Sequence, residues 1–347
     1  MSQLNVLDLV RKNIASLKPY SSARNEFKGK ASVYLDANEN PFAGEFSRYP
    51  DPLQWQLKFQ LARIKGVPAE NIFIGNGSDE VIDLAFRIFC NPGKDNVIIC
   101  PPTYGMYEVS ANINDVEIRK VPLTKDFQLD TSAILKAIDT STRLIFVCSP
   151  NNPTGNSMNS GAIKKLLEHF KGIVIIDEAY INYSAAKTFI AELVNYPNLL
   201  VMQTLSKAWG LAALRLGLCY GSMDIIDLFN KVKPPYNINQ ASQEIALKAL
   251  QNVSQVNEWI RVTVEERERL RQNLLSFSFV EHIFPSDANF LLIRVTDANA
   301  LYTFLAEGTI VVRNRSKETL CDNCLRITIG TPEENLSLIN LLNKYNG

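Results

Sequence analysis

Three polar side chains that could do chemistry each follow an apolar run of the chain. Asn152, Asp177 and Lys207 come after the runs at residues 144–148, 173–176 and 199–203. If these runs are parallel strands, the three side chains meet at one edge of a sheet, where wound α/β proteins bind ligands. A carboxylate at the end of a buried strand needs a partner, and a protonated pyridine nitrogen is one candidate. A lysine partly withdrawn from water there would be a nucleophilic amine.

Two glycine- and proline-containing loops fit the same edge. The sequence GNGSDE at residues 75–80 follows an apolar run and opens a predicted helix, whose free N–H groups and dipole suit a phosphate. It is not a dinucleotide-binding fingerprint, because Glu80 stands at the last glycine position, and no GxxxxGK[ST] loop is present. Its alternative is a plain helix cap by Ser78 or Asp79. The loop SPNNPTG at 149–155 would fix Asn152 through its prolines, or it is only a turn.

Composition excludes several classes of protein. Hydrophobic residues make up 46% of the 347 residues and charged residues 21%, which is typical of a globular fold and not of a disordered chain. Lys plus Arg and Asp plus Glu both total 36, so no global basic field exists to bind nucleic acid or an anionic membrane. The N-terminus lacks the apolar core of a signal peptide, and the apolar runs are too short to span a bilayer. We therefore expect a cytoplasmic protein.

The cysteines do not predict a metal site. Six are scattered along the chain, and only Cys321 and Cys324 form a close pair. A zinc site would need a second pair or histidines at ligand spacing, and the only histidines are His169 and His282. We predict no metal, and interpret the pair either as a local reversible disulfide or as plain surface thiols.

The surrounding elements predict an α/β fold with a large domain, whose mainly parallel sheet is flanked by helices, and a smaller α+β domain. Most of the apolar runs lack alternation, so we expect strands buried on both faces. The expected strands of the large domain are 72–74, 97–100, 117–121, 144–148, 173–176, 199–203 and 216–220.

After Lys233, Pro234 and Pro235 the pattern changes to long helices, predicted at 241–251 and 253–275. The smaller domain is predicted to hold strands 290–295, 310–313 and 325–329 and helices 300–306 and 333–345. The expected division is an N-terminal arm with part of the small domain at 1–44, the large domain at 45–235 and the small C-terminal domain at 236–347.

The order of these elements is more specific than any one of them. The loop at 75–80 is followed by Tyr104 in PPTYG, Asn152, Asp177 with Tyr180, and Ser206-Lys207 with Arg215. Over nearly the whole chain this order resembles the fold-type I pyridoxal-phosphate aminotransferases. Further segments are similar to the histidinol-phosphate aminotransferases among them: Pro19-Tyr20 with Ser22-Ala23-Arg24, LDANENP at 35–41, RYPDP at 48–52, SKAW at 206–209 through LRLG at 214–217, and LRITIG at 325–330.

The resemblance implies a role for each matching residue. Lys207 would carry pyridoxal 5'-phosphate as an internal Schiff base and then move the proton in catalysis. Asp177 would pair with the pyridinium N–H. The remaining contacts would be hydrogen bonds of Tyr180 and Asn152 to the ring oxygen, stacking of Tyr104 on the ring, and phosphate contacts from Ser78, Asp79, Thr204, Ser206 and Arg215. Glu80 is expected to point away.

The family resemblance also implies a homodimer, in which Tyr49 would reach the cofactor phosphate of the neighbouring subunit. Without the resemblance, Tyr49 would be interpreted as a packed loop tyrosine. Both amino donors, histidinol phosphate and glutamate, are anionic, and Arg313 and Arg326 are the candidates to bind them. Tyr20 would close the pocket and Asn38 would contact substrate.

The implied reaction is transfer of an amino group between L-histidinol phosphate and 2-oxoglutarate, giving imidazole acetol phosphate and L-glutamate in histidine biosynthesis. Two alternatives keep the cofactor: an aromatic or general amino-acid aminotransferase, and a threonine-phosphate decarboxylase. An alternative of another class is a cofactor-binding regulator without turnover. The chain has no spare basic helix-turn-helix segment of the kind such a regulator usually carries.

Overall fold

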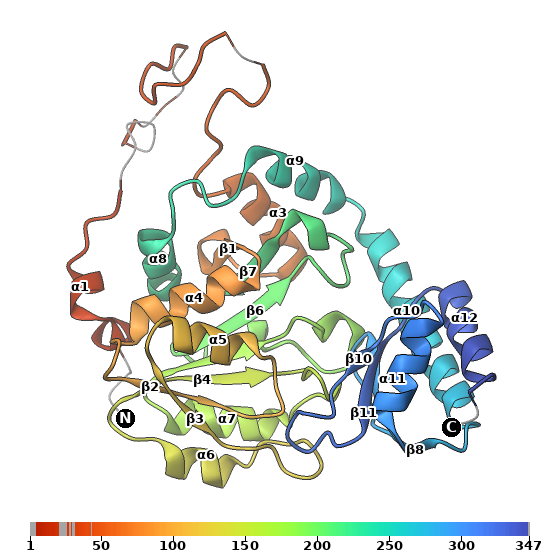
Figure 1. Ribbon diagram of the computed structural model, residues 1–347. Helices are drawn as coiled ribbons and strands as arrows, with labels where there is room; N and C mark the ends of the chain where they lie inside the picture. Colours follow the sequence, from red (N-terminus) through yellow and green to blue (C-terminus); the bar gives the residue numbers. More distant parts are fainter. Residues whose placement is uncertain (1–4, 21–25, 28, 30–31, 43, 346–347) are drawn as a thin grey trace.

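The computed structural model describes residues 5–20, 26–27, 29, 32–42 and 44–345 (Figure 1). Ser22-Ala23-Arg24, one of the segments behind the family resemblance, lies outside the described residues. Two sheets organise the rest of the chain, a large one of seven strands and a smaller one of four. Among the described residues, no helix combines the length and the apolar character needed to cross a membrane.

The large sheet has the order β1-β7-β6-β5-β4-β2-β3. Strand β7 runs antiparallel to β1 and β6, and all other neighbouring strands are parallel, so the prediction of a mainly parallel sheet is confirmed. Each of the seven predicted strands is present, with ends within two residues of those expected. Their bounds are β1 (Ile72–Asn76), β2 (Asn96–Ile99), β3 (Glu117–Lys120), β4 (Thr142–Cys148), β5 (Ile173–Asp177), β6 (Leu199–Thr204) and β7 (Leu216–Tyr220).

Both faces of the large sheet are covered, which explains the runs without alternation. Along β5, Val174 and Ile176 belong to one apolar core, whereas Ile173 and Ile175 belong to another on the opposite face. Helices α4, α5 and α8 contribute to the second core, and α3, α6, α7 and α9 to the first. Every side chain of β5 is buried, so this strand does not alternate between polar and apolar residues.

The helices follow the chain in the order shown in Figure 1. Their bounds are α1 (Lys12–Ala15), α3 (Trp55–Lys65), α4 (Ser78–Phe89), α5 (Met106–Ile113), α6 (Thr131–Ala137), α7 (Ser160–His169), α8 (Met223–Val232), α9 (Gln240–Ala249), α10 (Val253–Leu274), α11 (Ala298–Glu307) and α12 (Pro332–Leu342). Short 3-10 turns lie at Val6–Leu9, Ala69–Asn71, Ile181–Tyr183, Phe189–Glu192 and Ala212–Leu214.

The smaller sheet is antiparallel, with the order β10-β11-β9-β8. Its strands are β8 (Val280–Ile283), β9 (Phe290–Val295), β10 (Arg313–Asn314) and β11 (Cys324–Thr328), and α11 and α12 pack on its core. The domain limits proposed from the sequence stay a prediction.

Two expectations for the smaller sheet were wrong. Strand β8 was missed, because this short edge strand buries only Ile283 and exposes Glu281 and His282. The predicted strand 310–313 is reduced to β10, since the N–H of Ile310 is bound by the carbonyl of Leu305 at the end of α11 instead of by a neighbouring strand (2.8 Å).

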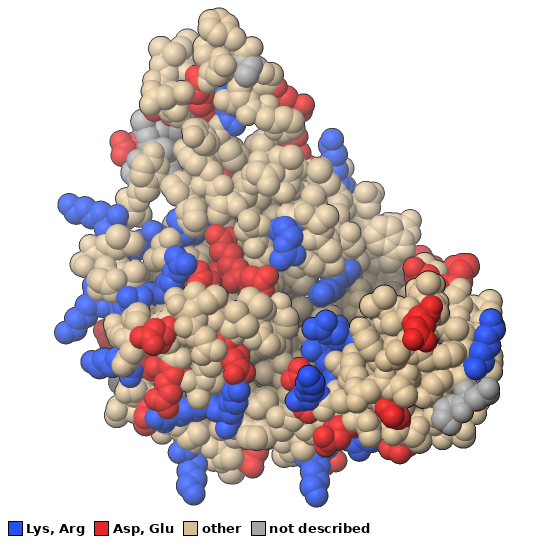
Figure 2. All heavy atoms as spheres, viewed as in Figure 1, with Lys and Arg blue, Asp and Glu red and all other residues tan. Residues whose placement is uncertain are grey.

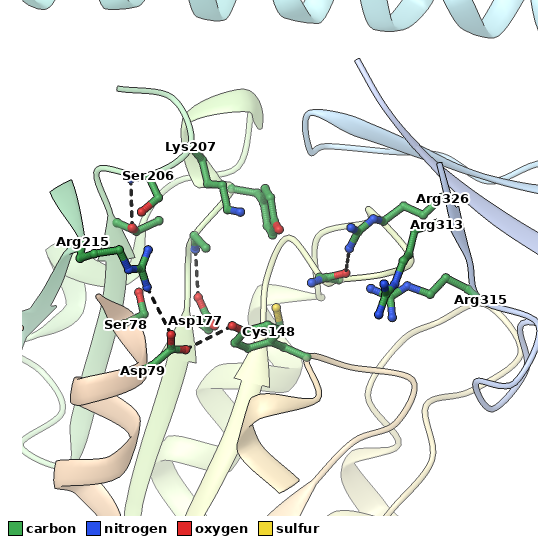
Figure 3. A pocket seen from close by; sticks show the side chains of 15 residues that line it. Ser78, Asp79, Cys148, Asp177, Ser206, Lys207, Arg215, Arg313, Arg315 and Arg326 are labelled. Atoms are coloured by element: carbon green, nitrogen blue, oxygen red, sulfur yellow. Dashed lines mark hydrogen bonds and ion pairs between the residues drawn. The ribbon is translucent and has the colours of Figure 1, made fainter. Parts of the chain in front are cut away.

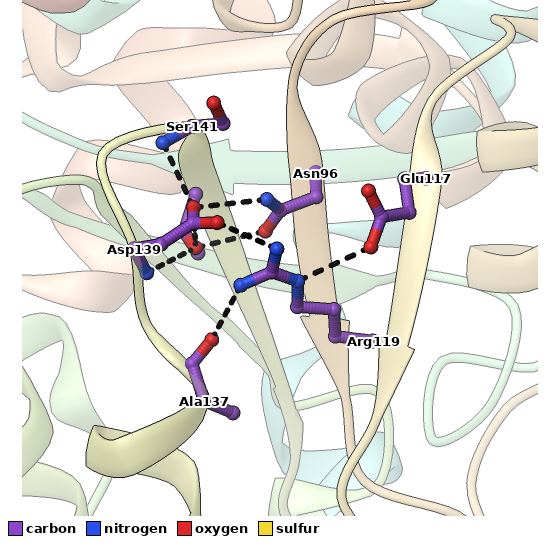
Figure 4. Close-up of polar contacts among 7 residues, drawn as sticks. Asn96, Glu117, Arg119, Ala137, Asp139 and Ser141 are labelled. Carbon is purple, nitrogen blue, oxygen red and sulfur yellow. Dashed lines mark hydrogen bonds and ion pairs between the residues drawn. The ribbon is translucent and has the colours of Figure 1, made fainter.

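A polar cluster ties together the first residues of β2, β3 and β4, at the edge of the sheet opposite to the strands' carboxyl ends (Figure 4). Asp139 accepts from Asn96 Nδ2 (3.0 Å) and from the backbone N–H of Ser141 (2.8 Å), and Arg119 bridges it to Glu117. These contacts, with the Asn96 hydrogen bond the largest, hold the pKa of Asp139 well below its usual range. The cluster fixes strand positions far from the site described next.

Candidate active site

The carboxyl ends of β4, β5 and β6 open into a cavity of about 390 Å³ that lies against the smaller sheet (Figure 3). Most of the predicted site residues line it: Ser78, Asp79, Tyr104, Asn152, Asp177, Tyr180, Thr204, Ser206, Lys207, Arg215, Arg313 and Arg326. The order of the sheet places β4, β5 and β6 side by side, and this adjacency brings Asn152, Asp177 and Lys207 together.

Asp177 is a buried carboxylate, 4% exposed, at the last position of β5. Its Oδ2 accepts a hydrogen bond from the hydroxyl of Tyr107 (2.7 Å), and its Oδ1 accepts one from the N–H of Ala179 (3.1 Å). Among the described residues it forms no ion pair. Burial therefore raises the pKa of Asp177, against the opposing effect of these hydrogen bonds. This carboxylate therefore has room for a cationic partner in the cavity.

Lys207 stands three residues beyond the end of β6, with its Nζ 5.5 Å from the centre of the Tyr180 ring. Lys207 is exposed to solvent as a residue, and its amine lines the cavity, where protein surrounds it only in part. This partial burial lowers the pKa of Lys207, and the positive charges of Arg326 and Arg215 lower it further, against the attraction of Asp177. A lowered pKa leaves a larger fraction of neutral, nucleophilic amine at a given pH.

Helix α4 presents an open N-terminus to the same cavity. Gly77 is its N-cap and no side chain caps it, so the interpretation of Ser78 or Asp79 as a capping side chain is wrong. A Cβ on Gly77 would lie 2.5 Å from Arg215 Nη2, and one on Gly217 would lie 2.4 Å from the backbone nitrogen of Ser78. Glycine at both positions therefore lets the helix start, Arg215 and β7 approach one another closely.

The polar groups around that helix start are suited to an anion. Arg215 Nη2 lies 3.3 Å from Asp79 Oδ2, in an ion pair whose partners are about half exposed, so water weakens it. Thr204 and Ser206 add hydroxyl groups from the end of β6. Glu80 is not among the lining residues, and accepts hydrogen bonds from Asn76 N and Asn237 Nδ2 instead, as expected.

Arginines occupy the side of the cavity next to the smaller sheet. Arg326 donates from Nη1 to Asn152 Oδ1 (2.5 Å), and its guanidinium lies 5.2 Å from the Phe290 ring. Arg313 and Arg315 come from the neighbouring strand and the loop after it, and their side chains reach the same space (Figure 3). In Figure 2, basic side chains gather where the part containing the large sheet meets the part with α11 and α12.

Three predicted residues lie away from this cavity in the described chain. Tyr20 is exposed, and Asn38 and Tyr49 line a second cavity of about 580 Å³ on the N-terminal arm. Tyr49 stacks on Tyr236 with a centroid distance of 4.4 Å.

Sequence reasoning missed three residues of the site, Tyr107, Cys148 and Arg315. Tyr107 lies three residues after Tyr104 in the helix that follows the PPTYG loop, and one face of a helix repeats at this spacing. Cys148 is the last residue of β4, and Arg315 is two residues from Arg313, the spacing that places strand side chains on one face. Such signals were present, but only the fold shows which face meets the cavity.

The close pair Cys321 and Cys324 is buried, which contradicts the interpretation as surface thiols. Both are free thiols. Cys324 begins β11, and both side chains belong to the core that also covers the large sheet.

Comparison with known proteins places the chain in a family. The model of the family "Aminotransferase class I and II" matches residues 25–342. A histidinol-phosphate aminotransferase of Parabacteroides distasonis is 55% identical over 335 residues, which are 96% of this chain and 97% of the relative. The chain belongs to the histidinol-phosphate aminotransferase family.

Solved structures of histidinol-phosphate aminotransferases have the same fold. The enzyme from Clostridium acetobutylicum has a TM-score of 0.79 at 25% identity, covering 86% of this chain and 90% of that chain. The enzyme from Sinorhizobium meliloti, solved in complex with pyridoxal-5'-phosphate, has a TM-score of 0.78 at 22% identity and covers 88% of both chains. The expectation of a fold-type I architecture is confirmed.

Pyridoxal phosphate is the cofactor of this aminotransferase family, and the lining residues fit it. Asp177 is a buried carboxylate that lacks a cation, which a pyridinium nitrogen would supply. The uncapped start of α4 and Arg215 offer donors to a phosphate. Lys207 offers an amine of lowered pKa to the aldehyde.

Proposed function

We propose that this member of the histidinol-phosphate aminotransferase family transfers the amino group of L-histidinol phosphate to 2-oxoglutarate, giving imidazole acetol phosphate and L-glutamate. The proposal rests on one observation, a single cavity that holds groups for catalysis on one side and groups for anion binding on the other. An amine of lowered pKa and a buried carboxylate lie on one side, and arginines from the smaller sheet lie on the other. Relatives that are 50–55% identical are histidinol-phosphate aminotransferases, which supports the same substrate.

On the catalytic side, Lys207 would tether the cofactor and Asp177 would hold its ring nitrogen in the protonated form. When bound, the cofactor's pyridinium ring takes up the electron pair left as a proton leaves the substrate carbon. The Nζ of Lys207, once free of the tether, would accept that proton and return it during transfer. Its lowered pKa favours the neutral amine that proton abstraction requires.

The remaining lining residues would fix the cofactor. Tyr104 would stack on the ring, and Tyr180 and Asn152 would bind its oxygen. The backbone of Ser78 and Asp79, the hydroxyls of Thr204 and Ser206, and Arg215 would hold the phosphate. Tyr180 is suited to a donor role, because burial raises the pKa of its hydroxyl well above the usual range.

On the substrate side, Arg313 and Arg326 would bind the anionic groups of the two amino donors in turn. Both line the cavity, and Arg326 is oriented by Asn152 and by the Phe290 ring. Tyr20 and Asn38 would complete the substrate pocket from the N-terminal arm.

We also propose a homodimer, in which the arm of one subunit reaches the site of the other. The described parts of the arm extend away from the body of the protein (Figure 1) and expose large apolar side chains, with Leu35 and Phe42 more than nine-tenths accessible. Apolar exposure on this scale is typical of a protein interface. Tyr49 would then contact the neighbouring subunit's cofactor phosphate.

Co-expression of Lys207→Ala and Tyr49→Phe subunits tests this arrangement. If Tyr49 acts across the interface, each hybrid dimer keeps one intact site, and its affinity for the cofactor at that site equals that of the wild type. If Tyr49 acts within its own subunit, the site retaining Lys207 keeps the weaker affinity of the Tyr49→Phe homodimer.

A half-reaction spectrum tests the reaction itself. Wild-type holoenzyme mixed with L-histidinol phosphate should change its cofactor absorbance and then form glutamate from 2-oxoglutarate. Lys207→Ala should lose turnover while it keeps its fold. A preference for phenylalanine would favour the general or aromatic aminotransferase, carbon dioxide release from threonine phosphate would favour the decarboxylase, and cofactor binding without any turnover would favour the regulator.

A further inference from the structure

Arg315 shares one face of the smaller sheet with Arg313 and Arg326. The Cα atoms of Arg313 and Arg326 are cross-strand partners between β10 and β11. The N–H of Arg315 donates to the carbonyl of Cys324 (2.8 Å), so strand pairing continues one residue beyond β10. Alternate residues of a strand point to the same face, and cross-strand partners do as well. All three guanidinium groups therefore project into the cavity that they line (Figure 3).

The residue between the two arginines confirms this assignment of faces. Asn314 donates from Nδ2 to Asn299 Oδ1 (2.8 Å) and lies near the carbonyl of Ala298, both at the start of α11. Helix α11 covers the opposite face of the smaller sheet. The backbone hydrogen bond from Arg315 to Cys324 thus fixes the face of the sheet from which the Arg315 side chain projects.

Arg315 has donor capacity that the described residues leave unused. Its Nη1 lies 3.3 Å from Glu318 Oε1, while its Nε is buried and has no partner among the described residues. The Nε of Arg326, which lines the same cavity, is also buried without a partner there. Buried polar groups normally have hydrogen-bond partners. Two unpaired guanidinium nitrogens on neighbouring strands, both from residues that line the cavity, indicate a missing acceptor.

The charge on this side of the cavity also indicates an anion. Of the three guanidinium groups only Arg315 has an ion-pair partner among the described residues, Glu318. The acidic lining residues, Asp79 and Asp177, come from the large sheet and α4. Burial lowers the pKa of Arg326, and the charges of Arg315 and Arg313 lower it further, so the cluster repels itself without a counter-ion.

We propose that Arg315 is a specificity-determining residue that holds the phosphate of the amino donor together with Arg313. This inference rests on the proposed reaction. It adds a reason why the cavity would prefer a phosphate monoester to a carboxylate. A phosphate monoester presents three oxygens and about two negative charges, whereas the side-chain carboxylate of glutamate presents two oxygens and one charge. A single guanidinium fork satisfies a carboxylate, so the additional guanidinium of Arg315 serves the phosphate and leaves glutamate nearly unaffected.

The test compares the two amino donors on the same holoenzyme. In Arg315→Gln, KM for histidinol phosphate should rise by about 10- to 100-fold, the effect of one or two charge-assisted hydrogen bonds. KM for glutamate, and kcat with glutamate, should stay close to wild type. Lys317→Gln is the matched control: it removes one positive charge from the same loop at an exposed position outside the cavity, and should change neither constant.

Unphosphorylated histidinol and inorganic phosphate provide independent measurements. Arg315→Gln should react with histidinol at the same rate as wild type, and inorganic phosphate should compete with histidinol phosphate less well in the variant than in wild type. Arg315→Lys, which keeps the charge but not the planar fork, should show a smaller loss with the same preference, and replaces the glutamine variant if that variant does not fold.

An equal rise in KM for histidinol phosphate and glutamate would overturn the inference, because it would mean that Arg315 only supports the sheet. No change with either donor would overturn it as well. Failure of the wild-type enzyme to react with histidinol phosphate would instead refute the proposed reaction, and would be visible before any variant is made.

Discussion

The hydroxyl of Tyr107 donates a 2.7 Å hydrogen bond to Oδ2 of Asp177, joining two buried residues from different elements. The Tyr107 ring is held between two others, stacked on Phe146 at 4.6 Å and edge-on to Tyr104 at 5.5 Å. This packing fixes the position of the Tyr107 hydroxyl, and its hydrogen bond in turn fixes the orientation of the Asp177 carboxylate. Tyr107 is therefore a positioning residue for Asp177.

Tyr107→Phe should lower kcat by about 10-fold, because a hydrogen bond to a charged group contributes about 1.5–3 kcal/mol. The variant leaves Asp177 less able to remain ionised, so the absorbance of the bound cofactor should titrate at a different pH. Tyr220→Phe is the matched control, since it removes a hydroxyl that is equally buried but has no partner among the described residues. An unchanged pH titration in Tyr107→Phe would show that the hydrogen bond is only structural.

Asp177→Asn should affect the cofactor-free and the loaded protein in opposite directions. Burial raises the pKa of Asp177 above its unfolded value, so the ionised carboxylate costs stability at neutral pH, and this cost disappears at acid pH, where the group is protonated in both states. The cofactor-free variant should thus resist urea better than wild type at pH 7, and no better at pH 3. Activity should fall by about 100-fold or more, as expected when a buried charge loses its partner.

Gly217→Ala should weaken cofactor binding without touching the cavity directly. The added Cβ would lie 2.3–2.5 Å from the backbone of Gly77 and Ser78, so the start of α4 must move. Overpacking of this kind costs about 1–3 kcal/mol of stability, and displacement of the N–H groups should raise the cofactor dissociation constant by about 10-fold. Gly105→Ala adds the same methyl group where nothing lies within 4 Å, and should leave both quantities unchanged.

Lys58→Met should show a pH-dependent gain in stability. Lys58 is 1% exposed, and burial, aided by the charge of Lys233, lowers its pKa to about 8 from an ordinary value of 10.5. The unfolded chain therefore binds more protons between these values, and the stability contributed by this group rises with pH across that window. The advantage of the variant over wild type should shrink by about 2–3 kcal/mol from pH 7.5 to pH 10.5.

Urea unfolding at several pH values checks this expectation, with Lys248→Met as the control at an exposed position. An advantage that does not depend on pH would mean that packing, and not the buried ammonium group, sets the stability at Lys58.

Local sequence determined the central strands and the identity of the main catalytic candidates. Segments such as 173–176 are apolar throughout because both faces of the sheet are covered, so their pattern is visible without any tertiary information. Asn152, Asp177 and Lys207 could be predicted because the chemistry requires unusual residue types at the ends of such strands. Strand β8 could not, since an exposed edge strand with one buried residue carries little signal.

Tertiary structure alone decided which side chains meet. The sheet order β6-β5-β4 brings the three strand ends together, and helix α5 places Tyr107 against Asp177 over a separation of 70 residues. The short pairing of β10 with β11 puts Arg315 beside Arg313 and Arg326. Residue type and spacing along a chain report the local period of a helix or strand, whereas contacts between distant elements depend on how those elements pack. The sequence therefore identifies Lys207 and Asp177 as reactive groups, and the packing of the two sheets supplies Tyr107 and Arg315 around them.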